Sequence, residues 1–169
     1  MISFIDTSAI LAVLDADDPN HLPAKSTWEK ALSGGDEFVC HNYILVECSA
    51  LIARRLGTEA SSVFASEIVP VLRVEWITRE IHGAAAGAHL VAARGSLSLV
   101  DCASFEIMRR TGLAAAFAFD QRVAGQTLAR HAVGVAHGDG AAVHVELVVR
   151  NAQLVAAVEH LHGEGFVEF

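Results

Sequence analysis

Short apolar runs alternate with longer helix-like segments along the chain, and this alternation limits the fold more than any other feature. The candidate strands are continuous apolar runs at 2–5, 37–40, 71–77, 114–119 and 133–136. Such runs, without polar alternation, are typical of strands buried on both faces of a parallel sheet. Helical segments between them predict crossovers that cover both faces. We therefore expect an α/β/α sandwich with a central, mostly parallel sheet of about five strands.

Helical spacing and stop signals place the segments between these strands. The predicted helices cover 7–14, 21–32, 42–56, 58–68, 78–94, 98–110 and 121–131, with Asn42 as a cap for the third. After residue 136 the pattern changes to one alternating strand at 143–149 and one helix at 151–162. We therefore predict one domain over 1–136 and a C-terminal strand and helix appendage over 137–169, which is not an independent domain.

The charge balance bounds the kind of nucleic-acid contact that this chain can make. Its 20 acidic residues outnumber its 12 lysines and arginines, which gives a net charge of −8. That sign disfavours non-specific coating of a phosphate backbone, which needs a basic surface. A nuclease is still compatible with it, because an acidic metal site itself lowers the total.

Other features concern the compartment and the core. No apolar run approaches the roughly 18 residues of a membrane span, and the N-terminal apolar stretch is too short, and lacks the basic start, for a secretory signal. We therefore expect a cytoplasmic protein. Its three cysteines, Cys40, Cys48 and Cys102, form no CxxC pair, which is typical of reduced, buried thiols. Trp28 and Trp76 are expected to pack in the interior.

Three carboxylates lie where strands end or helices begin. Asp6 ends the first predicted strand, Asp120 ends the fourth, and Asp101 lies in the first turn of the 98–110 helix. Ligands of open α/β sheets bind beyond the carboxyl ends of the strands, so these acids could share one site. The simpler alternative is helix capping: Asp6 or Asp120 could cap the helix that follows, and Asp101 could form a capping box with Ser98.

The position of Glu47 on its predicted helix is unusual for a carboxylate. Helical spacing places it in line with Ile44 and Leu51, on a face that is otherwise apolar. A carboxylate on such a face needs a counter-charge or a metal ion. An ion pair with Arg54 or Arg94 is the alternative, but four acids directed at one crevice favour a shared role.

The segments around these acids resemble the motif blocks of PIN-domain ribonucleases. The blocks are, in order, Phe4–Ala9, Val46-Glu47, Leu97–Asp101 and Phe119-Asp120. Within that family the best match is the VapC type, the toxin half of bacterial and archaeal toxin–antitoxin pairs, and the resemblance covers residues 1–136. The sequence departs from the family pattern at Ala118, where a hydroxyl residue is common, and at Val123, where phenylalanine is common.

The resemblance implies a metal-dependent endoribonuclease. It assigns both catalysis and metal binding to the same four acids, Asp6, Glu47, Asp101 and Asp120. Mg²⁺ or Mn²⁺ suits such oxygen ligands, and an ion held there would activate water for attack on a phosphodiester. Thr7 and Ser8 could orient a ligand or a water molecule, or simply cap the helix that they begin.

The same resemblance implies partners, namely an RNA substrate, a cognate antitoxin that inserts a segment into the crevice, and a second copy in a homodimer. Apolar residues that recur over 60–71 and in the tail need cover, either from the chain's own core or from that second copy. The competing hypothesis is a catalytically inactive PIN-fold module that binds RNA or protein.

Overall fold

The computed structural model describes residues 1–92, 97–119 and 144–146. Its strands form one sheet in the order β3–β2–β1–β4–β5. Their bounds are Ile2–Ile5 for β1, Glu37–His41 for β2, Leu72–Glu75 for β3, Ala115–Phe117 for β4 and His144–Glu146 for β5. The first four are mutually parallel, and β5 pairs antiparallel with β4. The expected sheet of about five mostly parallel strands is confirmed, with β1 at its centre.

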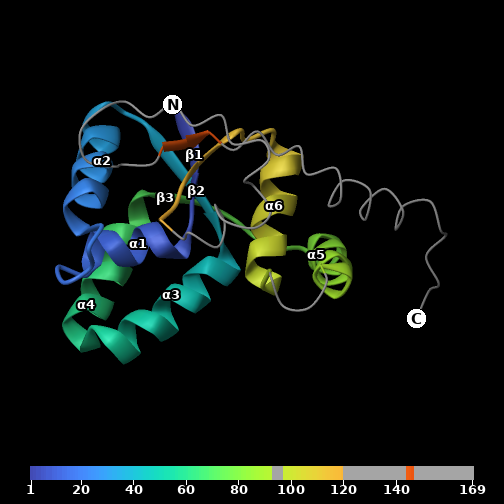
Figure 1. Cartoon of the computed structure of the whole chain (residues 1–169), viewed down its shortest axis with the longest axis horizontal. Coiled ribbons are helices and arrows are strands. Elements are labelled where there is room, and N and C mark those ends of the chain that lie inside the picture. Colours follow the sequence, from blue (N-terminus) through green and yellow to red (C-terminus); the bar gives the residue numbers. More distant parts are fainter. Residues whose placement is uncertain (93–96, 120–143, 147–169) are drawn as a thin grey trace.

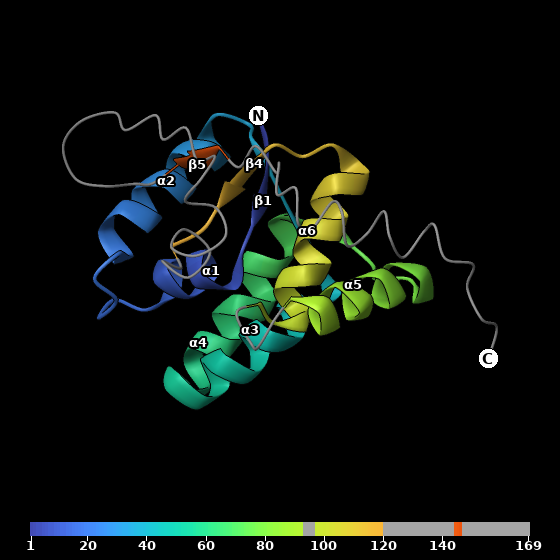
Figure 2. The same cartoon turned by 45° about the vertical axis from the view of Figure 1, so that its right-hand side comes forward.

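Helices cover both sides of this sheet. They are α1 (Thr7–Leu14), α2 (His21–Ser33), α3 (Asn42–Arg55), α4 (Gly57–Val63), α5 (Arg79–Val91) and α6 (Leu99–Thr111). Figures 1 and 2 show α1 and α2 together on one side of the strands, and α5 and α6 packed side by side on the other. The α/β/α architecture is therefore confirmed. None of the helices in the described part of the chain is long and apolar enough to cross a membrane.

The edge of the sheet is formed by residues of the segment predicted as an appendage. The strand expected at 133–136 and the helices expected at 121–131 and 151–162 lie outside the described residues. The edge strand in the structure is β5, which lies within the strand predicted at 143–149 and pairs Val145 with Ala116 of β4. The segment predicted as a C-terminal appendage thus supplies a strand to the main sheet.

One predicted helix cap was wrong, and one predicted helix is irregular in its second half. Asn42 does not cap α3: it is the first helical residue, and the cap is His41, whose ring accepts a hydrogen bond from the Ile44 N–H. The helix expected over 58–68 is α4 followed by a π turn (η1, Phe64–Ile68) and a 3₁₀ turn (η2, Val69–Val71). Pro70 lacks the N–H that an α-helix would need there, so the chain leaves the helix through irregular turns.

The core lies between the sheet and the helices that cover it. Trp28 stacks on Phe38 at 5.1 Å between ring centroids, and Phe38 stacks in turn on Phe117 of β4. All three cysteines are buried and free, as predicted. Of the apolar segment at 60–71, Phe64 and Ile68 are buried in this same core, whereas Val71 is 43% exposed. The prediction for Trp76 was wrong, because its side chain is 70% exposed.

Candidate active site

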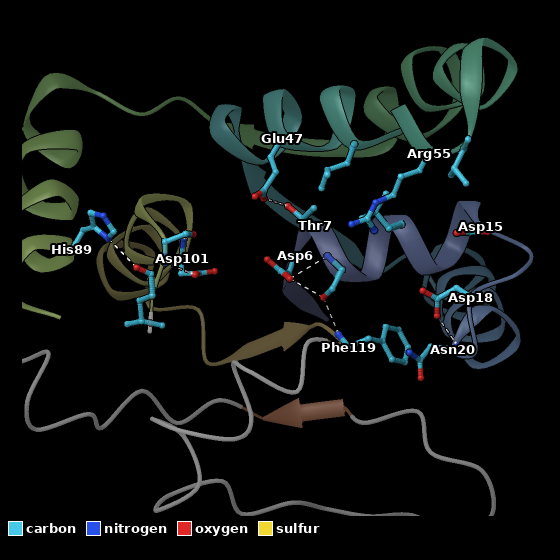
Figure 3. Close-up of a pocket in the computed structure, with 16 residues that line it drawn as sticks. Asp6, Thr7, Asp15, Asp18, Asn20, Glu47, Arg55, His89, Asp101 and Phe119 are labelled. Atoms are coloured by element: carbon cyan, nitrogen blue, oxygen red, sulfur yellow. Dashed lines mark hydrogen bonds between the residues drawn. The ribbon is translucent and has the colours of Figure 1, made fainter. Parts of the chain in front are cut away.

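A cleft of about 540 Å³ opens beyond the carboxyl ends of β1 and β4. Three of the four predicted acids line it, and Figure 3 shows the carboxylates of Asp6, Glu47 and Asp101 directed into the same part of it. The polar residues of its wall include Asp6, Thr7, Ser8, Asp15, Asp18, Asn20, Glu47, Arg55, His89, Ser98 and Asp101. The fourth predicted acid, Asp120, lies outside the described residues.

Asp6 stands at the junction of β1 and α1. Its Oδ2 caps α1 by accepting hydrogen bonds from the backbone N–H of Ser8 at 3.1 Å and from the Ser8 hydroxyl at 2.7 Å. Burial raises the pKa of Asp6 above its ordinary value, and the negative charge of Asp101 adds to this, whereas the bonds from Ser8 oppose it. The capping alternative is therefore realised, in a carboxylate that also faces a second negative charge.

Ser8 connects this acid to the end of the fourth strand. Its hydroxyl donates to Asp6 and accepts a hydrogen bond from the backbone N–H of Phe119 at 3.0 Å. Phe119 directly precedes Asp120 in the sequence. The Ser8 hydroxyl thus does more than cap a helix, because it ties the first acidic motif to the last one.

Glu47 is held by a residue that lies 40 positions away in the sequence. The Thr7 hydroxyl donates to Glu47 Oε2 at 2.6 Å, and so joins α3 to the first residue of α1. Within the described part of the chain Glu47 forms no ion pair, so the alternative of a bridge to Arg54 was wrong. Arg94, the other arginine considered, lies outside the described residues.

Asp101 forms the capping box that its spacing from Ser98 predicted. The backbone N–H of Ser98 donates to Asp101 Oδ2 at 2.7 Å, and the backbone N–H of Asp101 donates to the Ser98 hydroxyl at 3.0 Å. This reciprocal pair begins α6 and sets the direction in which the Asp101 carboxylate points.

The three acids share one arrangement. Each uses a single carboxylate oxygen for the protein's own hydrogen bonds: Oδ2 in Asp6, Oε2 in Glu47 and Oδ2 in Asp101. Among the described residues, the other oxygen of each acid takes part in no hydrogen bond. One oxygen is anchored and one is left toward the cleft, which is an arrangement suited to holding a cation or a water molecule.

The acids do not form a closed coordination shell. Within the described ranges no three His, Cys, Asp or Glu side chains are grouped closely enough to hold an ion between them. Mg²⁺ usually takes only one or two protein carboxylates and keeps several waters, so three touching ligands are not a requirement for it. The chemistry of the donors therefore fits a hard divalent cation.

The cleft also contains residues that the sequence motifs did not indicate. Arg55 enters it from the last turn of α3, eight residues after Glu47, with Leu51 between them. His89 of α5 donates its Nδ1–H to the Leu97 carbonyl at 2.8 Å. Helical spacing from Glu47 could have indicated Arg55, whereas His89 is brought to the cleft only by the packing of α5 on α6.

Most of the chain matches the model of a known protein family. Residues 3–126 match the model of the PIN domain. The chain belongs to the PIN-domain family. The match includes all four acids, among them Asp120, and so covers the motif blocks from which the resemblance was inferred.

The relatives of this PIN domain are of the VapC type. It is 33% identical over 118 residues to the 23S rRNA-specific endonuclease VapC20 of Mycobacterium tuberculosis, in strains H37Rv and CDC 1551. That alignment covers 69% of this chain and 88% of the relative. The crystal structure of M. tuberculosis VapC20, described as a sarcin–ricin loop cleaving toxin, matches with a TM-score of 0.64 and 31% identity, over 74% of this chain and 95% of VapC20. The predicted VapC-type PIN fold is confirmed.

Proposed function

We propose that this protein is an endoribonuclease toxin that cleaves RNA phosphodiester bonds at the acidic cleft. The observation that carries the proposal is the placement of Asp6, Glu47 and Asp101 in one cleft, each with one anchored oxygen and one directed inward. Its VapC20 relatives are named as 23S rRNA endonucleases, which makes ribosomal RNA the first substrate to test. Those names also favour a nuclease over an inactive interaction module.

The reaction uses Mg²⁺ or Mn²⁺, held by Asp6, Glu47, Asp101 and Asp120. Carboxylate oxygens are the donors that such ions prefer, and a cation would offset the burial and the repulsion that raise the pKa of Asp6. When bound, the ion lowers the pKa of a coordinated water and so supplies the nucleophile.

The protein's own contribution is orientation. The Thr7 hydroxyl fixes Glu47, the Ser8 hydroxyl fixes Asp6, and the capping box fixes Asp101. Because each anchor uses a hydrogen bond to an element that is itself packed in the fold, the carboxylates need little rearrangement when substrate arrives.

RNA cleavage with a chelator control tests the proposal. Ribosomal RNA incubated with the protein and Mg²⁺ or Mn²⁺ should be cut at defined sites, and EDTA should abolish cutting. Asp6→Asn and Asp101→Asn should each lower turnover by about two orders of magnitude or more while the fold is retained. Glu29→Gln, an exposed acid on α2 that does not line the cleft, is the matched control.

Two outcomes would contradict parts of the proposal. Equal cutting in EDTA would refute the metal mechanism and leave the nuclease assignment standing. Turnover by Asp6→Asn at the level of Glu29→Gln would refute the assignment of the site.

The proposal includes two protein partners, a cognate antitoxin and a second copy of the chain. Large apolar side chains that stay more than half exposed support protein contacts: Met1 at 63%, Leu22 at 78%, Val46 at 69%, Trp76 at 70%, Leu90 at 83% and Val91 at 58%. The antitoxin inserts a segment with a basic residue into the acidic cleft. Co-purification from the native operon tests the antitoxin, and light scattering tests the dimer, for which a mass near 17.9 kDa would be contradictory.

A further inference from the structure

We infer that Arg55 binds a backbone phosphate of the RNA beside the acidic group, and that it acts in holding the substrate and not in the chemical step. The inference rests on the proposed function, because it names a contact made by the substrate of that same cleft. It concerns a residue outside the four acidic motifs, and it follows from where α3 ends and from which charges line the cleft.

The position of Arg55 on α3 directs it into the cleft. Glu47, Leu51 and Arg55 are spaced four residues apart, so they share one face of the helix, and all three line the cleft. Eight residues of α-helix separate the backbones of Glu47 and Arg55 by about 12 Å along the helix axis. Figure 3 shows the Arg55 side chain extending from α3 toward α1, across the same cleft as the acids.

Arg55 carries a positive charge in a cleft that is lined mainly by acids. Five carboxylates line the wall, and among the described residues Arg55 is the only arginine or lysine that does so. A polyanion that approaches five acids needs a cation to hold it, and a guanidinium can bind phosphate through two parallel N–H donors. Without such a cation, the cleft would repel the backbone of its own substrate wherever no metal ion neutralises the acids.

Arg55 is not paired with any of the described acids that line the cleft. In the described part of the structure it forms no ion pair. Asp15 Oδ1 accepts the backbone N–H of Asp17 at 3.1 Å, and Asp18 Oδ1 accepts that of Asn20 at 2.7 Å. These two acids, which line the cleft with Arg55, are thus engaged in shaping the loop after α1.

The neighbouring Arg54 separates a phosphate contact from a purely helical role. Both arginines are exposed in the last turn of α3, where a positive charge stabilises the negative end of the helix dipole. Only Arg55 lines the cleft. A role in helix stability or in overall charge is therefore common to both residues, whereas a role in holding RNA belongs to Arg55 alone.

Paired substitutions test the inference. Arg55→Gln and Arg54→Gln are each made in the active chain, and again in an Asp101→Asn background in which RNA is cut too slowly to disturb a binding measurement. Affinity for a fluorescein-labelled single-stranded RNA is measured by anisotropy in Mg²⁺ buffer over a series of salt concentrations. Arg55→Gln should weaken binding about 5- to 10-fold and reduce the slope of log K against log salt by about 0.7, the value for one phosphate contact on a single strand.

The kinetic readout separates binding from chemistry. In the active chain, Arg55→Gln should raise KM by a similar factor with kcat within about twofold, because the lost contact is uniform for ground and transition states. Arg54→Gln should leave KM, kcat and the salt slope unchanged. Arg55→Lys keeps the charge without the bidentate fork, so its affinity should fall between those of the parent and Arg55→Gln.

The outcomes also separate this inference from the proposed function. If the parent protein cuts RNA but Arg55→Gln and Arg54→Gln behave alike, the phosphate contact is refuted and the nuclease assignment stands. If the parent cuts no RNA under any metal condition while Arg55 alone sets the salt slope, the proposed function fails and the contact stands. A fall in kcat without a change in KM would refute a holding role.

Discussion

Acid should destabilise this protein through the buried histidine His41. Its ring is fully buried at the end of β2, where Nδ1 accepts the Ile44 N–H at 3.4 Å and Nε2 lies 2.9 Å from the Ser104 hydroxyl of α6. With Nδ1 as acceptor, the neutral ring carries its proton on Nε2 and donates it to Ser104. Protonation of Nδ1 would place two N–H groups against each other at the start of the helix that carries Glu47.

The size of the destabilisation follows from the difference between the pKa of His41 in the unfolded chain and in the folded protein. Burial lowers the pKa of His41 from 6.5 to about 4, and the nearby Val100 carbonyl opposes this only in part. In the unfolded chain the imidazole takes up its proton near pH 6.5, so the stabilisation is complete above that pH and is lost as the pH falls to about 4. That difference corresponds to about 3 kcal/mol of unfolding free energy.

Urea unfolding from pH 7 to pH 4 measures this contribution. We compare the parent with His41→Asn, which keeps a side-chain acceptor at the helix cap and removes the titrating ring. The gap in unfolding free energy between them should narrow by about 3 kcal/mol over that interval. His82→Asn, at an exposed position on α5, is the control and should leave the pH dependence unchanged.

A direct titration gives a second measurement where the variant folds poorly. NMR of the ring protons should show His41 neutral down to about pH 5. A His41 that titrates near 6.5, or a His41→Asn variant with the parental pH dependence, would refute the reasoning.

Three further changes have expected signs. Asp6→Asn should raise the unfolding free energy measured by urea melts in EDTA. Burial raises the pKa of this acid, so its negative charge is costly when no cation is bound. A lower unfolding free energy in the variant would contradict this. Glu106→Ala should cost about 1–3 kcal/mol in thermal melts, since it removes a carboxylate that is 4% exposed and bonded to two arginines of α6; a neutral result would contradict it. Gly112→Ala, at φ 70°, should destabilise by about 1 kcal/mol, whereas Gly83→Ala, in open space on α5, should stabilise by a similar amount.

Periodicity was sufficient to predict the described strands and α-helices, but not the π and 3₁₀ turns after α4. The strand predicted at 2–5 is β1 with the same bounds, because a central parallel strand is buried on both faces and three of its four residues are large apolar ones. Helix starts were harder, since Asn42 is a favoured cap by residue type and the adjacent His41, which caps α3, is not. Tertiary contacts decided between them: β2 buries His41, while Asn42 Oδ1 accepts the Ile77 N–H at 2.8 Å.

The sequence was sufficient to predict which acids form the site, but not the hydrogen bonds that hold them in place. Motif spacing indicated Asp6, Glu47 and Asp101, and the structure places all three in one cleft. The bond from Thr7 to Glu47 joins residues from separate elements, and no local pattern indicates which hydroxyl will meet which carboxylate. Only the packing of α1 against α3 creates that pair.

Helix capping and a position in the acidic cleft are compatible for Asp6 and Asp101. A carboxylate has two oxygens, and a cap needs one. Asp6 and Asp101 each give Oδ2 to the start of a helix, and that bond fixes the direction of the oxygen that remains. Capping therefore orients these acids, because it holds the Oδ1 atoms in place before any ligand arrives. A capping motif at the end of a parallel strand is therefore no argument against a functional site there. The stronger indication of such a site is Glu47, which caps no helix and is held by the Thr7 hydroxyl.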